Sequence, residues 1–102
     1  MPRALLPDVG GSSEVLGRVT EDAARLTGLA AGTPVVGGGG DNACGAAGVG
    51  VVAEGEAVAI WGTSGVVLAP AARPIADPAL RAHTFAHVAP GTWFVSGVVL
   101  SA

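Results

Sequence analysis

Asp41 is the residue whose type and surroundings best suit it to chemistry. It directly follows four consecutive glycines, residues 37–40, and it precedes Asn42. Residues without a Cβ permit positive φ angles and let another molecule approach the backbone closely. An unperturbed aspartate is ionised at neutral pH and can accept a proton. That suits phosphoryl transfer, in which the attacking hydroxyl loses its proton late. The alternative is structural, because Asp is a favoured N-cap and a helix is expected to begin here.

A second candidate is the stretch Gly62-Thr63-Ser64-Gly65. A glycine-flanked loop of this kind presents backbone N–H groups and two hydroxyls, which can hold a phosphate without a lysine. It matches neither the phosphate loop GxxxxGK[ST] nor the GxSxG of serine hydrolases. The alternative is an ordinary β-hairpin turn, because β-rich runs lie on both sides of it.

Two histidines are four residues apart, at His83 and His87. Four residues is metal-ligand spacing on a helix, but Thr84, Phe85 and Val88 favour a strand. Two positions on one face of a strand would then lie about 13 Å apart, too far to share one metal ion. We therefore predict that these side chains are structural or line a cleft, and that the chain has no metal site of its own.

Composition limits the classes of function. The chain has 102 residues, of which 50% are hydrophobic and 13% charged, with a net charge of −3. Its basic residues are scattered arginines without a stripe, so we expect no nucleic-acid partner. Its apolar stretches are short and broken by glycine, whereas a membrane span takes about 20 residues. The lone cysteine and the absence of a signal peptide at the start of the chain favour the cytoplasm.

The elements that would position these residues can be read from turn and cap signals. We expect an edge strand at 15–19 and a short helix with Thr20 as its N-cap and Gly28 at its C-terminal end. A strand at 35–36 leads into the glycines, and a helix of small residues follows at 41–48. Four further strands are expected at 56–61, 66–69, 81–88 and 92–100. The first half is thus α/β and the second half an antiparallel meander.

Three stretches together resemble the FGGY family of carbohydrate kinases: AGTPVVGGGGDNACGAAGVG (31–50), IWGTSGVV (60–67), and HTFAH (83–87) leading to GVVLSA (97–102). GGGDNA followed by GTSG is the specific combination. The resemblance implies an α/β chain that is part of an actin-like, ribonuclease H-like ATPase fold with a cleft between two domains. Residues 1–52 would be the C-terminal part of the N-terminal, sugar-binding domain. Residues 53–102 would be the start of the C-terminal, nucleotide-binding domain, which opens with the antiparallel β-meander.

The resemblance also implies an activity, the transfer of the γ-phosphate of ATP, with Mg²⁺, to the 5-hydroxyl of D-xylulose. Asp41 would be the catalytic base and would contact the sugar together with Asn42. Gly62, Thr63 and Ser64 would contact the phosphates of ATP. Two alternatives stay open, namely a family member acting on gluconate, ribulose or glycerol, and a small non-catalytic ligand-binding module.

We expect the chain to be a piece of a longer polypeptide. Its partners would then be the rest of the parent polypeptide, the sugar and ATP. An exposed half-cleft and an unpaired sheet edge would favour association of separate chains. A homodimer is therefore the alternative to a partner within the parent polypeptide. Because phosphoryl transfer depends on positioning and charge stabilisation from the whole cleft, the 102-residue chain alone should not phosphorylate xylulose.

Overall fold

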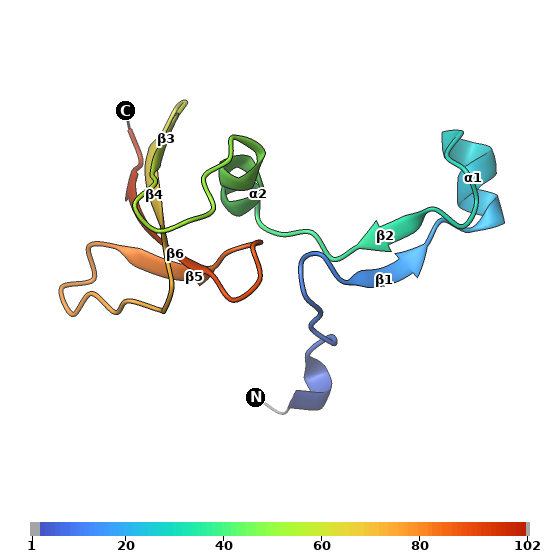
Figure 1. Ribbon diagram of the computed structural model, residues 1–102, viewed down its shortest axis with the longest axis horizontal. Helices are drawn as coiled ribbons and strands as arrows, with labels where there is room; N and C mark the ends of the chain where they lie inside the picture. Colours follow the sequence, from blue (N-terminus) through green and yellow to red (C-terminus); the bar gives the residue numbers. More distant parts are fainter. Residues whose placement is uncertain (1–2, 102) are drawn as a thin grey trace. The chain divides into compact units, whose positions relative to one another are not determined.

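The computed structural model describes residues 3–101. In Figure 1 the helices and strands are labelled in chain order: η1 (Arg3–Leu5), β1 (Val15–Arg18), α1 (Glu21–Thr27), β2 (Pro34–Val36), α2 (Asp41–Gly48), β3 (Val58–Trp61), β4 (Gly65–Ala71), β5 (His83–Ala86) and β6 (Trp93–Val99). These elements form two compact units, Met1–Gly38 and Gly39–Ala102. The expected family-domain boundary, between residues 52 and 53, concerns a longer polypeptide and stays a prediction.

The first unit is a two-stranded antiparallel ribbon with a short helix between its strands. β1 pairs with β2, with Val15 opposite Val36 and Arg18 opposite Pro34, and a bulge interrupts the register between them. α1 begins and ends where its cap signals predict. The Thr20 hydroxyl accepts the N–H of Ala23, and Gly28 closes the helix in the left-handed conformation. These local rules therefore suffice to define the helix.

The second unit is built on a four-stranded antiparallel sheet. Its strand order is β3-β4-β6-β5, so β4 pairs with β6 along its whole length, from Gly65 opposite Val99 to Ala71 opposite Trp93. The antiparallel sheet is as predicted, but a simple meander, in which each strand pairs with the next, is wrong. β4 and β6 are seven residues long and β5 is four. The two long strands satisfy more ladder hydrogen bonds together, which leaves β5 at an edge.

Helix α2 packs on this sheet and makes the core of the unit. Ala43 and Ala46, three residues apart on one face of the helix, are buried against Leu68 of β4 and Phe94 of β6. Val51, Val58 and Val88 pack around this cluster as partly buried neighbours. Alanine at both helix positions lets the helix approach the sheet closely. This close packing accounts for the small residues in the segment.

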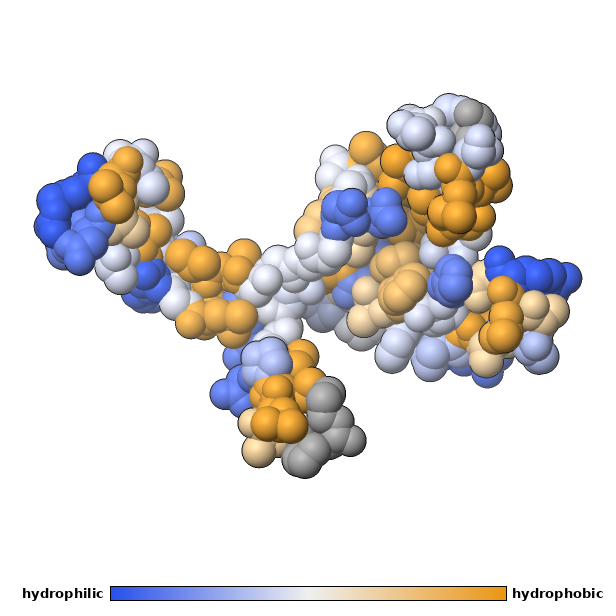
Figure 2. Space-filling view, turned by 180° about the vertical axis from the view of Figure 1, so that it is seen from behind, coloured by the Kyte–Doolittle hydropathy of each residue, from blue (hydrophilic) through white to orange (hydrophobic). Residues whose placement is uncertain are grey.

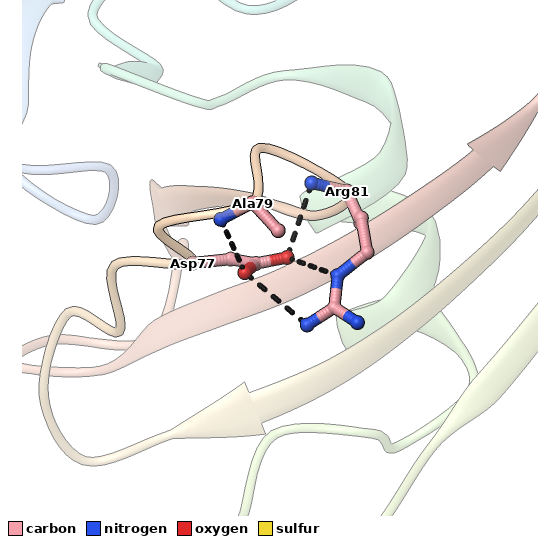
Figure 3. A network of polar contacts seen from close by, with 3 residues as sticks. All are labelled: Asp77, Ala79 and Arg81. Carbon is pink, nitrogen blue, oxygen red and sulfur yellow. Dashed lines mark hydrogen bonds and ion pairs between the residues drawn. The ribbon is translucent and has the colours of Figure 1, made fainter.

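The loop between β4 and β5 is organised by one carboxylate. Asp77 accepts hydrogen bonds from the backbone N–H of Ala79 (2.9 Å) and from the backbone N–H and side-chain Nε of Arg81 (3.0 Å each), as Figure 3 shows. The Arg81 side chain, followed by the Ala79 N–H, holds the pKa of Asp77 below its usual value. The loop therefore keeps its shape through polar contacts on the surface.

Of the helices in residues 3–101, none is both long and apolar enough to cross a membrane.

Candidate functional site

Asp41 is the first residue of helix α2, and the core beneath the helix holds it in place. The N-cap is Gly40, which has extended backbone angles (φ −61°, ψ 148°) and no side chain to cap with. Capping by Asp41, the structural alternative drawn from the sequence, is therefore wrong. The helix begins one residue earlier than that role requires. Asp41 Oδ1 instead accepts the N–H of Asn42 (2.8 Å), in a first turn where the helix dipole favours negative charge.

The side chains of Asp41 and Asn42 stand at a pocket of 360 Å³ in the second unit. It lies between the first turn of α2 and the strands β5 and β6. Its lining residues are Gly40, Asp41, Asn42, Ala43, Phe85, Ala86 and Phe94. Asp41 is exposed and Asn42 is half-buried, so both can reach a bound molecule. A volume of this size is within the range of small-molecule sites, about 300–1,000 Å³.

The pocket has one ionisable side chain and two aromatic rings. Asp41 is that side chain, and no Arg or Lys is among the residues that line the pocket. Phe85 and Phe94 face each other across β5 and β6, with ring centroids 5.5 Å apart and planes tilted by 38°. The site therefore combines a hydrogen-bonding wall on the helix with an apolar wall on the sheet.

The two phenylalanines were not among the candidates drawn from the sequence. Phe85 and Phe94 lie far along the chain from Asp41, and the antiparallel register that pairs them directly is what brings them together. The short β-rich runs around them predict strands, but they do not predict which strand lies beside the helix. No local signal could have found them.

The predicted phosphate loop forms the tip of the β3–β4 hairpin, as expected. The strands close at Trp61 opposite Gly65, and the N–H of Gly62 donates to the carbonyl of Ser64 (3.0 Å). That N–H is therefore already used within the turn. Thr63 is exposed and Ser64 is half-buried. Neither of them lines the pocket at Asp41.

His83 and His87 were predicted to lie on one strand, and this prediction is wrong. β5 ends at Ala86, and His87 belongs to the turn that follows, where its N–H donates to the carbonyl of Thr92 (2.9 Å). His87 is buried, and its Nδ1 accepts the N–H of Ala89 (3.1 Å). The early end of the strand follows from the tight turn around Gly91, whose φ is +72°.

Within residues 3–101 there is no group of three or more His, Cys, Asp or Glu side chains that could hold a metal ion.

The model of the FGGY family of carbohydrate kinases, N-terminal domain, matches residues 1–67. The xylulose kinase of Escherichia coli K12 is 39% identical over 102 residues, which is 100% of this chain and 21% of that protein. The autoinducer-2 kinase of Yersinia enterocolitica is 41% identical over 87 residues, 85% of this chain and 16% of that protein.

Solved structures show the same fold. The xylulose kinase from Brucella ovis superposes with a TM-score of 0.88 at 38% identity, over 98% of this chain and 21% of that one. The xylulose kinase from Rhodospirillum rubrum gives 0.88 at 31% identity, over 100% of this chain and 20% of that one. The chain thus spans about one fifth of the length of the relatives it matches.

Proposed function

Because the chain belongs to the FGGY family of carbohydrate kinases, we propose that it carries part of the active site of an ATP-dependent kinase whose acceptor is D-xylulose. The observation that carries this proposal is the position of Asp41. Its carboxylate is exposed at a pocket, on a helix whose next residues are anchored in the core. A base held in this way can meet a substrate hydroxyl in a fixed geometry, as general base catalysis requires.

In the proposed reaction the 5-hydroxyl oxygen of the sugar attacks the γ-phosphorus of ATP. A new O–P bond forms there, and the bond from that phosphorus to the bridging oxygen breaks, so that ADP leaves with the electron pair. Asp41 accepts the proton of the hydroxyl as it attacks. The side chain of Asn42, one residue on and half-buried in the same pocket, hydrogen-bonds the sugar and fixes its orientation.

Gly62, Thr63 and Ser64 are proposed to hold the phosphates of ATP. The Gly62 N–H donates to the Ser64 carbonyl within the turn. Thr63 and Ser64 then act as the donors, while Gly62 allows close approach because it has no side chain. Preorganised donors of this kind stabilise the charge that spreads over the transferred phosphoryl group.

The family's reaction uses Mg²⁺, but the described residues do not fit a magnesium site. Beside the pocket there is one carboxylate, and residues 3–101 hold no cluster of potential ligands. When bound, Mg²⁺ would offset the charge of the nucleotide phosphates.

Residues 1–52 would complete the sugar-binding domain and residues 53–102 would open the nucleotide-binding domain. The rest of the parent polypeptide would close the cleft, and a homodimer is the further assembly to test. The cytoplasm, where ATP is plentiful, is the proposed compartment.

The autoinducer-2 kinases give a specific second candidate for the acceptor. The relative from Yersinia enterocolitica is as similar in identity, 41%, as the xylulose kinases are. Kinases for gluconate, ribulose or glycerol and a non-catalytic module stay as further alternatives. Turnover measured with each acceptor in parallel would rank them.

The test is the variant Asp41→Asn in the complete reading frame that contains this sequence. Loss of a general base lowers turnover by about 10²–10⁴-fold. The melting temperature should stay near that of the parent, because Asp41 is exposed. Near-normal turnover in this variant would remove Asp41 from the mechanism. ATP-dependent turnover by the purified 102-residue chain alone would contradict the expectation that the whole cleft is needed.

A further inference from the structure

One wall of the pocket at Asp41 is formed by a phenylalanine side chain that stays partly exposed in this unit. Phe85 is 51% exposed, whereas Phe94, directly opposite on β6, is 5% exposed. The two rings contact each other, with centroids 5.5 Å apart, and both line the pocket. Phe94 therefore packs against the Phe85 ring, and about half of Phe85 stays exposed at the cavity.

The reason Phe85 stays open lies in the way the sheet and the helix meet. β5 is an edge strand, and α2 contacts the sheet through Ala43 and Ala46 against Leu68 and Phe94. α2 has eight residues, so it is about 12 Å long. The core that it forms with β4 and β6 does not include Phe85. The aromatic surface is thus held in place by the fold without being covered by it.

The opposite wall has complementary chemistry. The first turn of α2 brings the carboxylate of Asp41 and the amide of Asn42 to the same cavity, together with the backbone of Gly40. A sugar has the matching shape, because its hydroxyls project along the edges and its C–H groups form an apolar face. Burying such a face against an aromatic ring is favourable, since both surfaces lose contact with water.

The charge of the pocket restricts the sugar further. Asp41 is the one ionisable side chain among the lining residues, and no Arg or Lys lies beside it. A carboxylate or phosphate on the substrate would therefore face like charge at Asp41, and none of the described residues that line this wall carries a cation to offset it. The lining favours an uncharged sugar over a sugar acid or a sugar phosphate.

We propose that Phe85 is a substrate-binding residue, the apolar wall against which the carbon chain of an uncharged sugar packs while Asp41 and Asn42 take its hydroxyls. This inference rests on the proposed function, because it assumes that the pocket at Asp41 is the acceptor site.

The experiment compares Phe85→Ala and Phe85→Leu with the parent in the complete reading frame. The KM for D-xylulose should rise about tenfold in Phe85→Ala and about threefold in Phe85→Leu, because leucine keeps part of the apolar surface. The KM for ATP should not change. Val67→Ala is the matched control, since Val67 is 52% exposed and does not line the pocket. Its KM for the sugar should equal that of the parent.

An unchanged KM for the sugar in Phe85→Ala, or an equal rise in the KM for ATP, would overturn the proposal. If the alanine variant does not fold, Phe85→Leu is judged by the same criterion. Turnover of gluconate above that of xylulose would overturn the preference for an uncharged sugar. The variant Asp41→Asn distinguishes a failure of the proposed function from a failure of the role proposed for Phe85. If that variant keeps its activity, the proposed function fails. If it is inactive while Phe85→Ala binds sugar normally, this inference alone fails.

Discussion

Different forces stabilise the two units of the chain, each within itself. In the first unit none of the described residues, 3–38, is buried, and its shape depends on backbone hydrogen bonds and helix caps. In the second unit a helix packs on a four-stranded sheet, with Leu68 and Ala46 fully buried. The candidate base stands on that packed helix. The proposed base therefore lies in the unit that has a core of its own.

The first unit leaves its apolar side chains open to solvent. Figure 2 shows such side chains gathered on the visible surface of the β1–β2 ribbon, and the exposed large residues of these two strands are Val15, Leu16, Val35 and Val36. Adjacent exposed apolar residues on a short ribbon are typical of a surface that packs against another element. In this unit backbone hydrogen bonds and polar side-chain contacts therefore determine the local structure, and burial of apolar side chains contributes little to its stability.

The largest expected effect comes from removing a core side chain of the second unit. Leu68→Ala should lower the free energy of unfolding by about 2–5 kcal/mol, because it leaves a cavity under α2. In the first unit Leu26 is 87% exposed, and Leu26→Ala should change the stability by about 0.5 kcal/mol or less. Amide hydrogen exchange, read separately for each unit, measures both changes. An equal loss in the free energy of unfolding for the two variants would contradict this difference between the units.

A smaller effect is expected from backbone substitution in the first unit. Gly38 has a φ of +69°, and its N–H donates to the carbonyl of Ser12 (2.9 Å). A side chain in this conformation costs about 1–2 kcal/mol. Gly38→Ala should therefore speed exchange of the amide at position 38. Gly17→Ala is the control, because Gly17 has no positive φ and a Cβ there meets no atom within 4 Å. Similar exchange in both variants would show that the backbone conformation is not what holds this loop.

The smallest effect is expected in the loop around Asp77, a part of the second unit that is stabilised by polar contacts, as the first unit is. The pKa of Asp77 is lowered from 3.8 by Arg81 and the Ala79 N–H. Its stabilising contribution is therefore present above that ordinary value and is lost as the pH falls through the lowered pKa. Asp77→Asn should speed exchange of the Ala79 and Arg81 amides above that pH, and the two proteins should converge in stronger acid.

Asp8→Asn is the control for this experiment, because Asp8 is exposed and belongs to the other unit. A constant difference between Asp77→Asn and the parent at every pH would remove the carboxylate charge as the cause.

Local rules predicted most of the elements from the sequence. Thr20 and Gly28 define α1 because a hydroxyl cap and a left-handed glycine act within one turn of the chain. The helix of small residues at 41–48 and the hairpin closed by Gly62 to Gly65 also lie where they were expected. The glycine run was interpreted too broadly. Gly38 has a positive φ, and a Cβ on Gly37 would come within 2.6 Å of the Gly11 carbonyl oxygen, but Gly40 has neither constraint.

The sequence by itself determined where helices and turns begin, because caps and glycine conformations depend on neighbouring residues. It also singled out Asp41 from its place between a glycine run and a helix. The tertiary structure alone decided that β4 pairs with β6 and that Phe85 lies across the pocket from Asp41. These contacts join residues far apart in the chain. Their register is set by strand pairing and by packing of the whole unit, which no local pattern encodes.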